Sequence, residues 1–284
     1  MNNTPTHPEL LAKHNALLKR LAELESCAVA FSGGVDSAVV AKAAQLALGA
    51  KAVAVTANSP SVAQGEVEQA VELAKLIGIQ HRVISTQEMQ NPAYRRNAPD
   101  RCYHCKTELY GNLTGLLDEL GVSVVVSGNN ADDLGDYRPG LQAASEHRVC
   151  SPLAECGITK SDVRQLAALW QLPVSDKPAT PCLSSRIAYG EEVTPDLVRM
   201  IDQAEQFLCR AGLPELRVRY HRGDLARVEV PLSHLSQFCQ SPFREQFITH
   251  LRSLGFLYIT LALQGFRSGS HNSILSSGGL PMLV

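Results

Sequence analysis

Short apolar runs alternate, over the first two thirds of the chain, with segments whose apolar residues recur every three or four positions. The runs are typical of strands: CAVAF (27–31), KAVAVT (51–56), HRVIS (81–85) and VSVVVSG (122–128). The other segments are typical of amphipathic helices: 8–25, 37–48, 62–77, 104–120 and 160–170. Because nearly all-apolar strands alternate with helices, the pattern predicts an α/β fold with a parallel sheet covered on both faces.

The pattern changes after Tyr189. Thr194 is placed to cap a helix with Pro195 in its first turn, and two alternating runs, 215–221 and 225–231, flank a Gly-Asp turn. Helical periodicity over 233–254 and an apolar run at 256–263 complete the segment. We therefore expect a first domain over 1–189 and a small α+β domain over 190–284, which a chain of 284 residues is long enough to form.

Composition narrows the class of protein. The net charge is −2, and the part after Tyr189 has nine Arg and no Lys against nine acidic residues, so neither region shows the basic excess of a nucleic-acid-binding protein. No long apolar run predicts a membrane span, and the first residues, MNNTPTHPELLAKHN, do not have the pattern of a secretory signal. We expect a cytoplasmic protein whose eight cysteines serve metal binding or catalysis rather than disulfides.

The sequence SGGVDS follows the first apolar run and begins a helix. Its glycines let backbone N–H groups approach an anion, Ser32 and Ser37 add hydroxyls, and Asp36 is suited to hold a divalent cation against phosphates. A tight strand-to-helix turn would need the glycines but neither the aspartate nor both serines. The Walker lysine and the G-x-G-x-x-G pattern are both missing. The segment resembles the pyrophosphate loop (PP-loop) of the N-type ATP pyrophosphatases, which implies cleavage of ATP between its α- and β-phosphates.

Three cysteines form the second chemical signal. Cys102 and Cys105 in RCYHCK have a spacing that suits one metal or cluster, although a zinc half-site, a redox pair or two packed thiols share it. Cys182, in KPATPCLSSR, lies in a proline-containing loop, with Arg186 four positions later. Three thiolates with no fourth partner fit a 4Fe–4S cluster with one open iron; alternatively, Cys182 gives up its own sulfur. Arg186 and Arg101 would favour the thiolate in either case.

The remaining cysteines have other expected roles. Cys27 and Cys209 are predicted to lie in the core, because the first begins an apolar run and the second accompanies Leu208 on a helix. Cys150 and Cys156 flank SPLAE and could form a second metal pair.

Charged residues gather at two further places. Asp132, Asp133, Asp136 and Arg138 follow the fourth apolar run in SGNNADDLGDYR, where the ends of parallel strands bind ligands, although a surface turn would look similar.

Arg217 and Arg219 alternate along a predicted strand and could together hold a phosphate or carboxylate of a substrate, or form a solvated face. Glu205 and Glu229 are candidates for binding a cation or for orienting these arginines.

Taken together, SGGVDS, GNNADDLGDYRPG, PCLSSR, RVRY and FRSGSHN resemble the LarE family of ATP-dependent sulfurtransferases of nickel-pincer nucleotide biosynthesis, over nearly the whole chain. The resemblance implies a homohexamer that adenylates a carboxylate of pyridinium-3,5-biscarboxylic acid mononucleotide and converts it to a thiocarboxylate. It further implies that Ser32, Gly33, Gly34, Asp36 and Ser37 bind ATP phosphates and Mg²⁺.

The family contains two types of member, of which one has a single sacrificial cysteine that ends as dehydroalanine. The other has a CxxC as well and is expected to use a 4Fe–4S cluster, and the three cysteines here match that type. A tRNA thiolase with the same ATP step and a non-catalytic ATP- or metal-binding protein remain the alternative interpretations.

Overall fold

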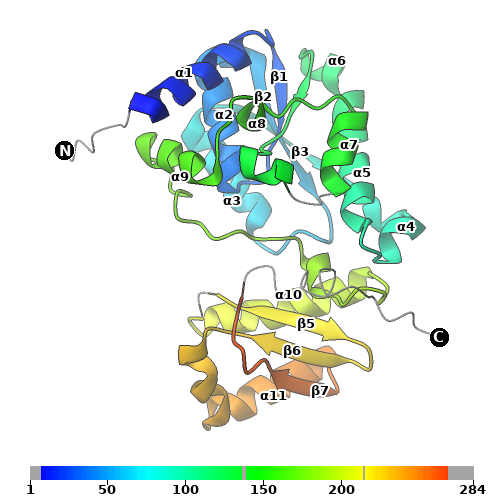
Figure 1. Cartoon of the computed structure of the whole chain (residues 1–284). Coiled ribbons are helices and arrows are strands. Elements are labelled where there is room, and N and C mark those ends of the chain that lie inside the picture. Colours follow the sequence, from blue (N-terminus) through cyan, green and yellow to red (C-terminus); the bar gives the residue numbers. More distant parts are fainter. Residues whose placement is uncertain (1–7, 136–138, 214, 268–284) are drawn as a thin grey trace. The chain divides into compact units, whose positions relative to one another are not determined.

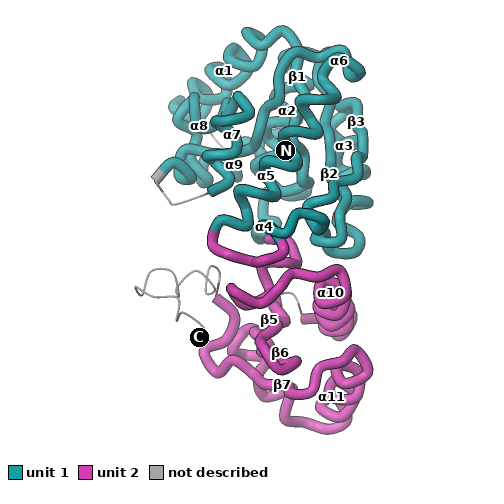
Figure 2. Tube along the Cα trace, turned by 90° about the vertical axis from the view of Figure 1, so that its right-hand side faces the viewer, with its two compact units in different colours: residues 1–94, 100–180 teal, residues 95–99, 181–284 magenta. Residues whose placement is uncertain are grey.

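The structure is a computed structural model that describes residues 8–135, 139–213 and 215–267. The chain divides into two compact units, which Figure 2 colours separately. The first comprises residues 1–94 and 100–180, and the second comprises residues 95–99 and 181–284. Arg138, one of the predicted site residues, lies outside the described residues, as does Asp136.

A four-stranded parallel sheet forms the centre of the first unit, in the order β3-β2-β1-β4 (Figure 1). The strands are β1 (Cys27–Ala30), β2 (Ala52–Asn58), β3 (Gln80–Ser85) and β4 (Val125–Val126). Cys27 is in register with Ala52, and Ala28 with Val125. The predicted parallel α/β sheet is confirmed, and β4 is much shorter than its apolar run.

Helices connect these strands. They are α1 (Pro8–Ala22), α2 (Val35–Leu48), α3 (Glu66–Ile77), α4 (Pro92–Arg95), α5 (Arg101–Gly115), α6 (Leu117–Leu120), α7 (Pro139–Glu146), α8 (Pro152–Glu155) and α9 (Lys160–Leu169). Short 3₁₀ turns occupy Gly49–Lys51, Glu88–Gln90 and Ala131–Gly135. Among the described residues, no helix combines the length and apolarity that crossing a bilayer requires.

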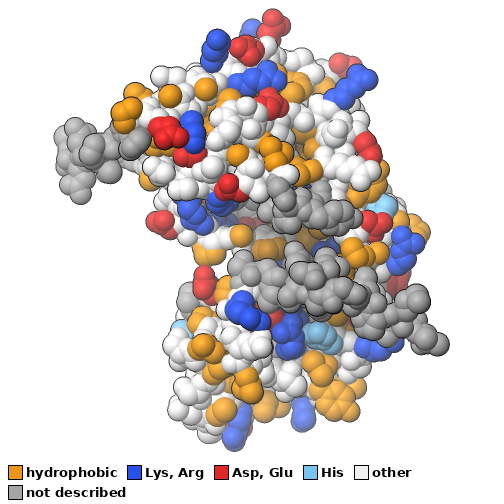
Figure 3. Space-filling model, in the orientation of Figure 1, with side chains coloured by type: hydrophobic (Ala, Val, Ile, Leu, Met, Phe, Trp, Pro, Cys, Tyr) orange, Lys and Arg blue, Asp and Glu red, His pale blue; other side chains and the backbone are white. Residues whose placement is uncertain are grey.

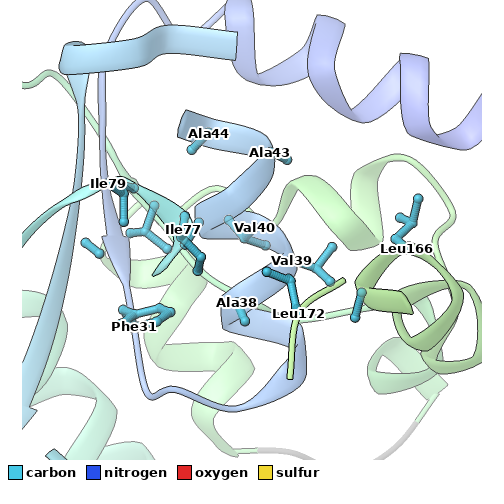
Figure 4. Packing of buried hydrophobic residues seen from close by; sticks show 14 of the residues in the cluster. Phe31, Ala38, Val39, Val40, Ala43, Ala44, Ile77, Ile79, Leu166 and Leu172 are labelled. Carbon is cyan, nitrogen blue, oxygen red and sulfur yellow. The ribbon is translucent and has the colours of Figure 1, made fainter. Parts of the chain in front are cut away.

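Side chains of β1 alternate between two cores, because successive strand residues point to opposite faces of a sheet. Cys27 and Val29 belong to a core that α1, α2, α3 and α9 complete, and Figure 4 shows Leu166 and Leu172 packed there near Val39. Ala28 belongs to the opposite core, with residues of α5 and α7. Helices therefore cover both faces of the sheet, as the sequence predicts.

Several features differ from the sequence-based expectation, of which two bear on the site and its surroundings. The second helix begins at Val35, not Ser37, so Asp36 and Ser37 lie in its first turn. Helix α7 has no counterpart in the expectation, since its proline and glycine start and its two buried alanines, Ala143 and Ala144, give a weak apolar stripe.

A three-stranded sheet packs with helices in the second unit. Its order is β5 (Arg217–His221), β6 (Leu225–Glu229) and β7 (Tyr258–Leu261); the first pair is antiparallel and the second parallel. The helices are α10 (Pro195–Arg210) and α11 (Phe243–Leu254), with 3₁₀ helices at Leu183–Arg186 and Leu232–Cys239. The α+β class is as expected, and the helical material predicted over 233–254 forms two helices, with Pro242 directly before the second.

Replacing Thr159 with alanine should destabilise the first unit. Thr159 and Asp162 form a reciprocal capping box at the start of α9, in which each side chain accepts a hydrogen bond from the other residue's backbone N–H. Losing such a cap costs about 1 kcal/mol of unfolding free energy. Urea unfolding followed by the fluorescence of Trp170, the single tryptophan, reports this change, because Trp170 follows the last turn of α9.

The matched control is Gln165→Ala on the exposed face of the same helix. It should change the unfolding free energy by less than about 0.5 kcal/mol. Equal losses in both variants would contradict a capping role for Thr159.

Candidate functional site

The SGGVDS segment forms the turn between β1 and α2. Gly33 has a φ of +72°, which favours glycine, and a Cβ added there would lie only 3.2 Å from the Cβ of Ala70 on α3. Gly34 is the N-cap residue of α2, and no side chain caps this helix end. The N–H groups and the positive end of the helix dipole therefore form an anion-binding arrangement.

The two serines hold this turn together. The Ser37 hydroxyl donates to the carbonyl of Gly34 at 3.0 Å and lies 3.3 Å from the Ser32 hydroxyl, which accepts from the N–H of Gly34 at 3.4 Å. Both hydroxyls thus shape the turn between β1 and α2.

Asp36 is held from two other segments of the first unit. One carboxylate oxygen accepts from the Asn130 amide at 3.0 Å, and the other forms an ion pair with the ammonium of Lys160. The side chains of Asp36 and Lys160 are 25% and 36% exposed, so the pair is accessible to solvent. A carboxylate with neighbouring hydroxyls is the hard oxygen donor set that Mg²⁺ prefers, and the residues present therefore fit that ion.

The loop after β4 lies against the start of α2. A Cβ added to Gly128 would stand 2.9 Å from the backbone nitrogen of Ser37 and 3.2 Å from the Cβ of Asp36. Since the nearest obstacle is backbone, a side chain at this position would force the loop and the helix apart. Glycine here brings Asn130 within reach of Asp36.

Asp132 and Asp133 organise this loop. The Asp133 carboxylate is buried and accepts from the backbone N–H of Asn130 at 3.0 Å. The Asp132 carboxylate accepts from the backbone N–H of Lys160 at 2.8 Å. Through these bonds the two predicted ligand-binding carboxylates fix the positions of Asn130 and Lys160.

Cys102 and Cys105 lie near the start of α5, in the first unit. Residues three apart are neighbours on a helix surface, so the two thiols share one face. Cys102 is exposed and Cys105 is partly buried. Cysteine thiols are ligands that iron–sulfur clusters and zinc both accept, so these two residues are suitable for either kind of centre.

Cys182 lies in the second unit, directly before the 3₁₀ helix Leu183–Arg186, and is exposed. Arg186 is only 2% exposed and donates to the carbonyls of Cys182, at 3.0 Å, and of Pro181. Its other nitrogens form a bidentate pair with Glu205, at 3.1 Å each. Arg186 thus fixes the backbone that carries the thiol.

Among the described residues, no group of three or more His, Cys, Asp or Glu is arranged to hold a metal ion. The proximity of Cys182 to the CxxC pair stays a prediction, since the three thiols belong to different units. Burial raises the pKa of the Cys150 and Cys156 thiols, which disfavours the thiolate a second metal pair would need. Cys27 is buried as expected, whereas Cys209 is exposed and the core prediction for it is wrong.

Several arginines of the second unit lie around the buried Glu205 and Glu229. Glu229, 1% exposed, pairs with Arg219 at 3.1 Å and with Arg227 at 2.9 Å. The guanidinium carbon of Arg217 lies over the ring of Phe266, 5.1 Å from its centroid. Burial, together with the positive charges of Arg186 and Arg219, lowers the pKa of this guanidinium to about 10. Basic side chains gather over β5 and β6 on the visible face of this unit (Figure 3).

Glu205 and Glu229 therefore orient arginines, which is one of their two expected roles. Glu205 also accepts from the backbone N–H of Val218 at 2.9 Å. Together with Arg186, Arg217, Arg219 and Arg227, these two glutamates form what is here termed the arginine cluster. Four guanidiniums against two carboxylates leave a cationic excess, which suits an anionic ligand.

Lys160, Asn130 and Gly128 are functional candidates that the sequence analysis does not single out. The predicted helix over 160–170 placed Lys160 at a helix start. Its position beside Asp36 depends on how the segment after β1, the loop after β4 and the start of α9 meet, which no local pattern encodes.

Comparison with known proteins places the chain in a family. The NAD synthase family model matches residues 14–108. A pyridinium-3,5-bisthiocarboxylic acid mononucleotide synthase from Lactiplantibacillus plantarum is 37% identical over 95% of this chain and 98% of its own length. An uncharacterized protein from Synechocystis is 46% identical over 94% of this chain and 99% of its own.

A tRNA-specific 2-thiouridylase from Azorhizobium caulinodans is 32% identical, but over only 53% of this chain and 48% of its own length. The similarity to that class of enzyme is therefore partial, whereas the similarity to the synthase covers nearly all of both chains. On this identity, and on a PP-loop at the start of α2, the protein belongs to the LarE family of PP-loop sulfurtransferases.

Proposed function

We propose that this enzyme adenylates a carboxylate of pyridinium-3,5-biscarboxylic acid mononucleotide with ATP and replaces the activated oxygen with sulfur. The observation that carries the proposal is the full-length similarity to a synthase named for the bisthiocarboxylic product. The PP-loop and the arginine cluster supply, respectively, a place for the triphosphate and a place for an anionic substrate.

The first step is the attack of a substrate carboxylate oxygen on the α-phosphorus of ATP. Pyrophosphate leaves, and the acyl group becomes an adenylate whose AMP is a good leaving group. The N–H groups of Gly33, Gly34 and the first turn of α2 stabilise the charge on the departing pyrophosphate. Mg²⁺, when bound, adds neutralising charge at the same phosphates, and Asp36 is the carboxylate that would hold it.

The second step forms a carbon–sulfur bond at the acyl carbon and releases AMP. Two sources of sulfur are consistent with the residues present. Cys182 can attack the acyl carbon to form a thioester; loss of its Cα proton to a base and cleavage of its Cβ–Sγ bond then leave the sulfur on the product and dehydroalanine in the chain. Alternatively, the thiols of Cys102, Cys105 and Cys182 can hold a 4Fe–4S cluster. Such a cluster, when bound, would supply a transferable sulfide.

We propose distinct roles for the two units. The first, with the PP-loop, is the ATP pyrophosphatase domain, and the second binds the substrate through the arginine cluster and contributes to assembly as a homohexamer. In this division Arg217 contacts an anionic group of the substrate. Arg219 is held by Glu229 and adds positive charge beside it, whereas Arg186 positions the loop of Cys182. Within the described SGNNADD loop, Asp132 and Asp133 act by holding Asn130 and Lys160.

Asp36→Asn should reduce adenylation. The variant loses the charge that a divalent cation needs, so substrate-dependent exchange of labelled pyrophosphate into ATP should fall by about 100-fold or more. The control is Asp118→Asn, an exposed acid on α6, which should retain the exchange rate of the wild type. Exchange at the wild-type rate in Asp36→Asn would contradict the assigned role.

Arg217→Gln should weaken substrate binding without affecting ATP. Removing one charge-assisted contact to an anionic group should raise the KM for the pyridinium mononucleotide by about 10- to 100-fold. Arg222→Gln is the matched control, since Arg222 is an exposed arginine paired with Glu191. If both variants raise the KM equally, or if only ATP binding changes, the arginine cluster is not the substrate site.

The source of sulfur is decided by anaerobic purification followed by iron, sulfide and intact-mass measurements. A cluster predicts iron in the wild type that Cys102→Ser or Cys182→Ser loses and that Cys239→Ser, at another exposed thiol, retains. The sacrificial route predicts iron-free protein that becomes lighter by one H₂S at Cys182 after a turnover. Active Cys182→Ser protein would contradict both routes.

A further inference from the structure

Lys160 forms an ion pair with Asp36, the carboxylate of the PP-loop that would bind a metal ion. Its ammonium pairs with Asp36, and among the described residues this is the one carboxylate within ion-pair distance of it. We propose that Lys160 is a second ATP-binding residue, which neutralises Asp36 while the site is free of nucleotide. When a divalent cation binds Asp36, the Lys160 ammonium leaves Asp36 and pairs with a phosphate oxygen of ATP instead. The inference rests on the proposed ATP-dependent function and deepens it.

The exchange is energetically accessible. Ion pairs between partly exposed side chains contribute little net stability, because water solvates both partners and screens their attraction. A divalent cation offers Asp36 twice the positive charge, so it can displace the ammonium. The Asn130 amide can stay on the other carboxylate oxygen while this happens, which keeps Asp36 oriented.

The backbone of Lys160 is anchored while its side chain is adaptable. Its N–H donates to Asp132 at 2.8 Å, the Thr159–Asp162 capping box flanks it, and Asp162 also pairs with Lys13 at 2.7 Å. A lysine side chain has a flexible stem of four carbons that ends in a compact ammonium group. The ammonium can therefore change its partner while the helix backbone stays in place.

Helix stability does not account for a lysine at this position. Lys160 is the first residue of α9, where the helix dipole favours acidic side chains and disfavours cations. Because the helix dipole disfavours a lysine here and the residue lies beside the PP-loop, a role in ligand binding explains Lys160 better than a role in stabilising α9.

Two binding measurements distinguish this role from a purely structural one, because they should change in opposite directions. In nucleotide-free Lys160→Met, Asp36 has lost its competitor, so Mn²⁺ binding followed by EPR should tighten by about two- to fivefold. Binding of α,β-methylene-ATP with Mg²⁺, measured by calorimetry, should weaken by about 10- to 100-fold, since one charged contact is lost.

Two further variants complete the test. Lys177→Met removes a comparable lysine–carboxylate pair, with Glu66 at 2.9 Å in the same unit, and should change neither affinity. Lys160→Arg keeps the charge and should recover much of the nucleotide affinity. Trp170 fluorescence on urea titration checks that each variant is folded.

The result that overturns the inference is a Lys160→Met protein that is folded but binds Mn²⁺ no more tightly, or the ATP analogue no more weakly, than the wild type. If the wild type itself binds neither probe, the ATP-dependent function fails and the role of Lys160 fails with it. The wild-type measurement thus separates the failure of one proposal from that of the other.

Discussion

Pairing of β1 with both β2 and β4 is the interaction on which the arrangement of the first unit depends. Ala28 is in register with Val125, so the strands that precede SGGVDS and SGNNADD are direct neighbours. Parallel strands end at the same edge of a sheet, and their following loops must meet there. The contacts of Asp36 with Asn130, and the close approach of Gly128 to α2, follow from this pairing.

Much of this fold follows from local pattern. Short apolar runs and helical stripes predict the strands and most helices of the first unit, and SGGVDS predicts a phosphate-binding turn, because these features depend on residues close together in the chain. The pattern does not predict that α9 begins beside Asp36. Lys160 is 124 positions from Asp36, and only the packed sheet with its covering helices brings them into contact.

The charged residues of the second unit also combine a feature that local sequence predicts with contacts that only the fold creates. Alternation along β5 suggests that Arg217 and Arg219 act together, but it cannot tell which arginines already have partners. The structure shows Glu229 shared between Arg219 and Arg227 in a nearly inaccessible position. Such burial is costly unless each charge is compensated, and removing one partner of a buried pair costs about 3–5 kcal/mol. Replacing one of these glutamates should therefore destabilise the unit as much as replacing the arginine that it pairs with.

Exposure and partner number separate cations that can bind a ligand from cations that position the chain. Arg186 is 2% exposed, and its guanidinium is committed to Glu205 and to the carbonyls of Pro181 and Cys182. A ligand could recruit it only by breaking several bonds in a low-dielectric interior. Lys160 is 36% exposed, and among the described residues its ammonium pairs with one carboxylate, that of Asp36. A positive charge is thus buried and held by several partners at Arg186 but partly exposed and held by one carboxylate at Lys160, and this difference arises from the fold around each residue rather than from residue type.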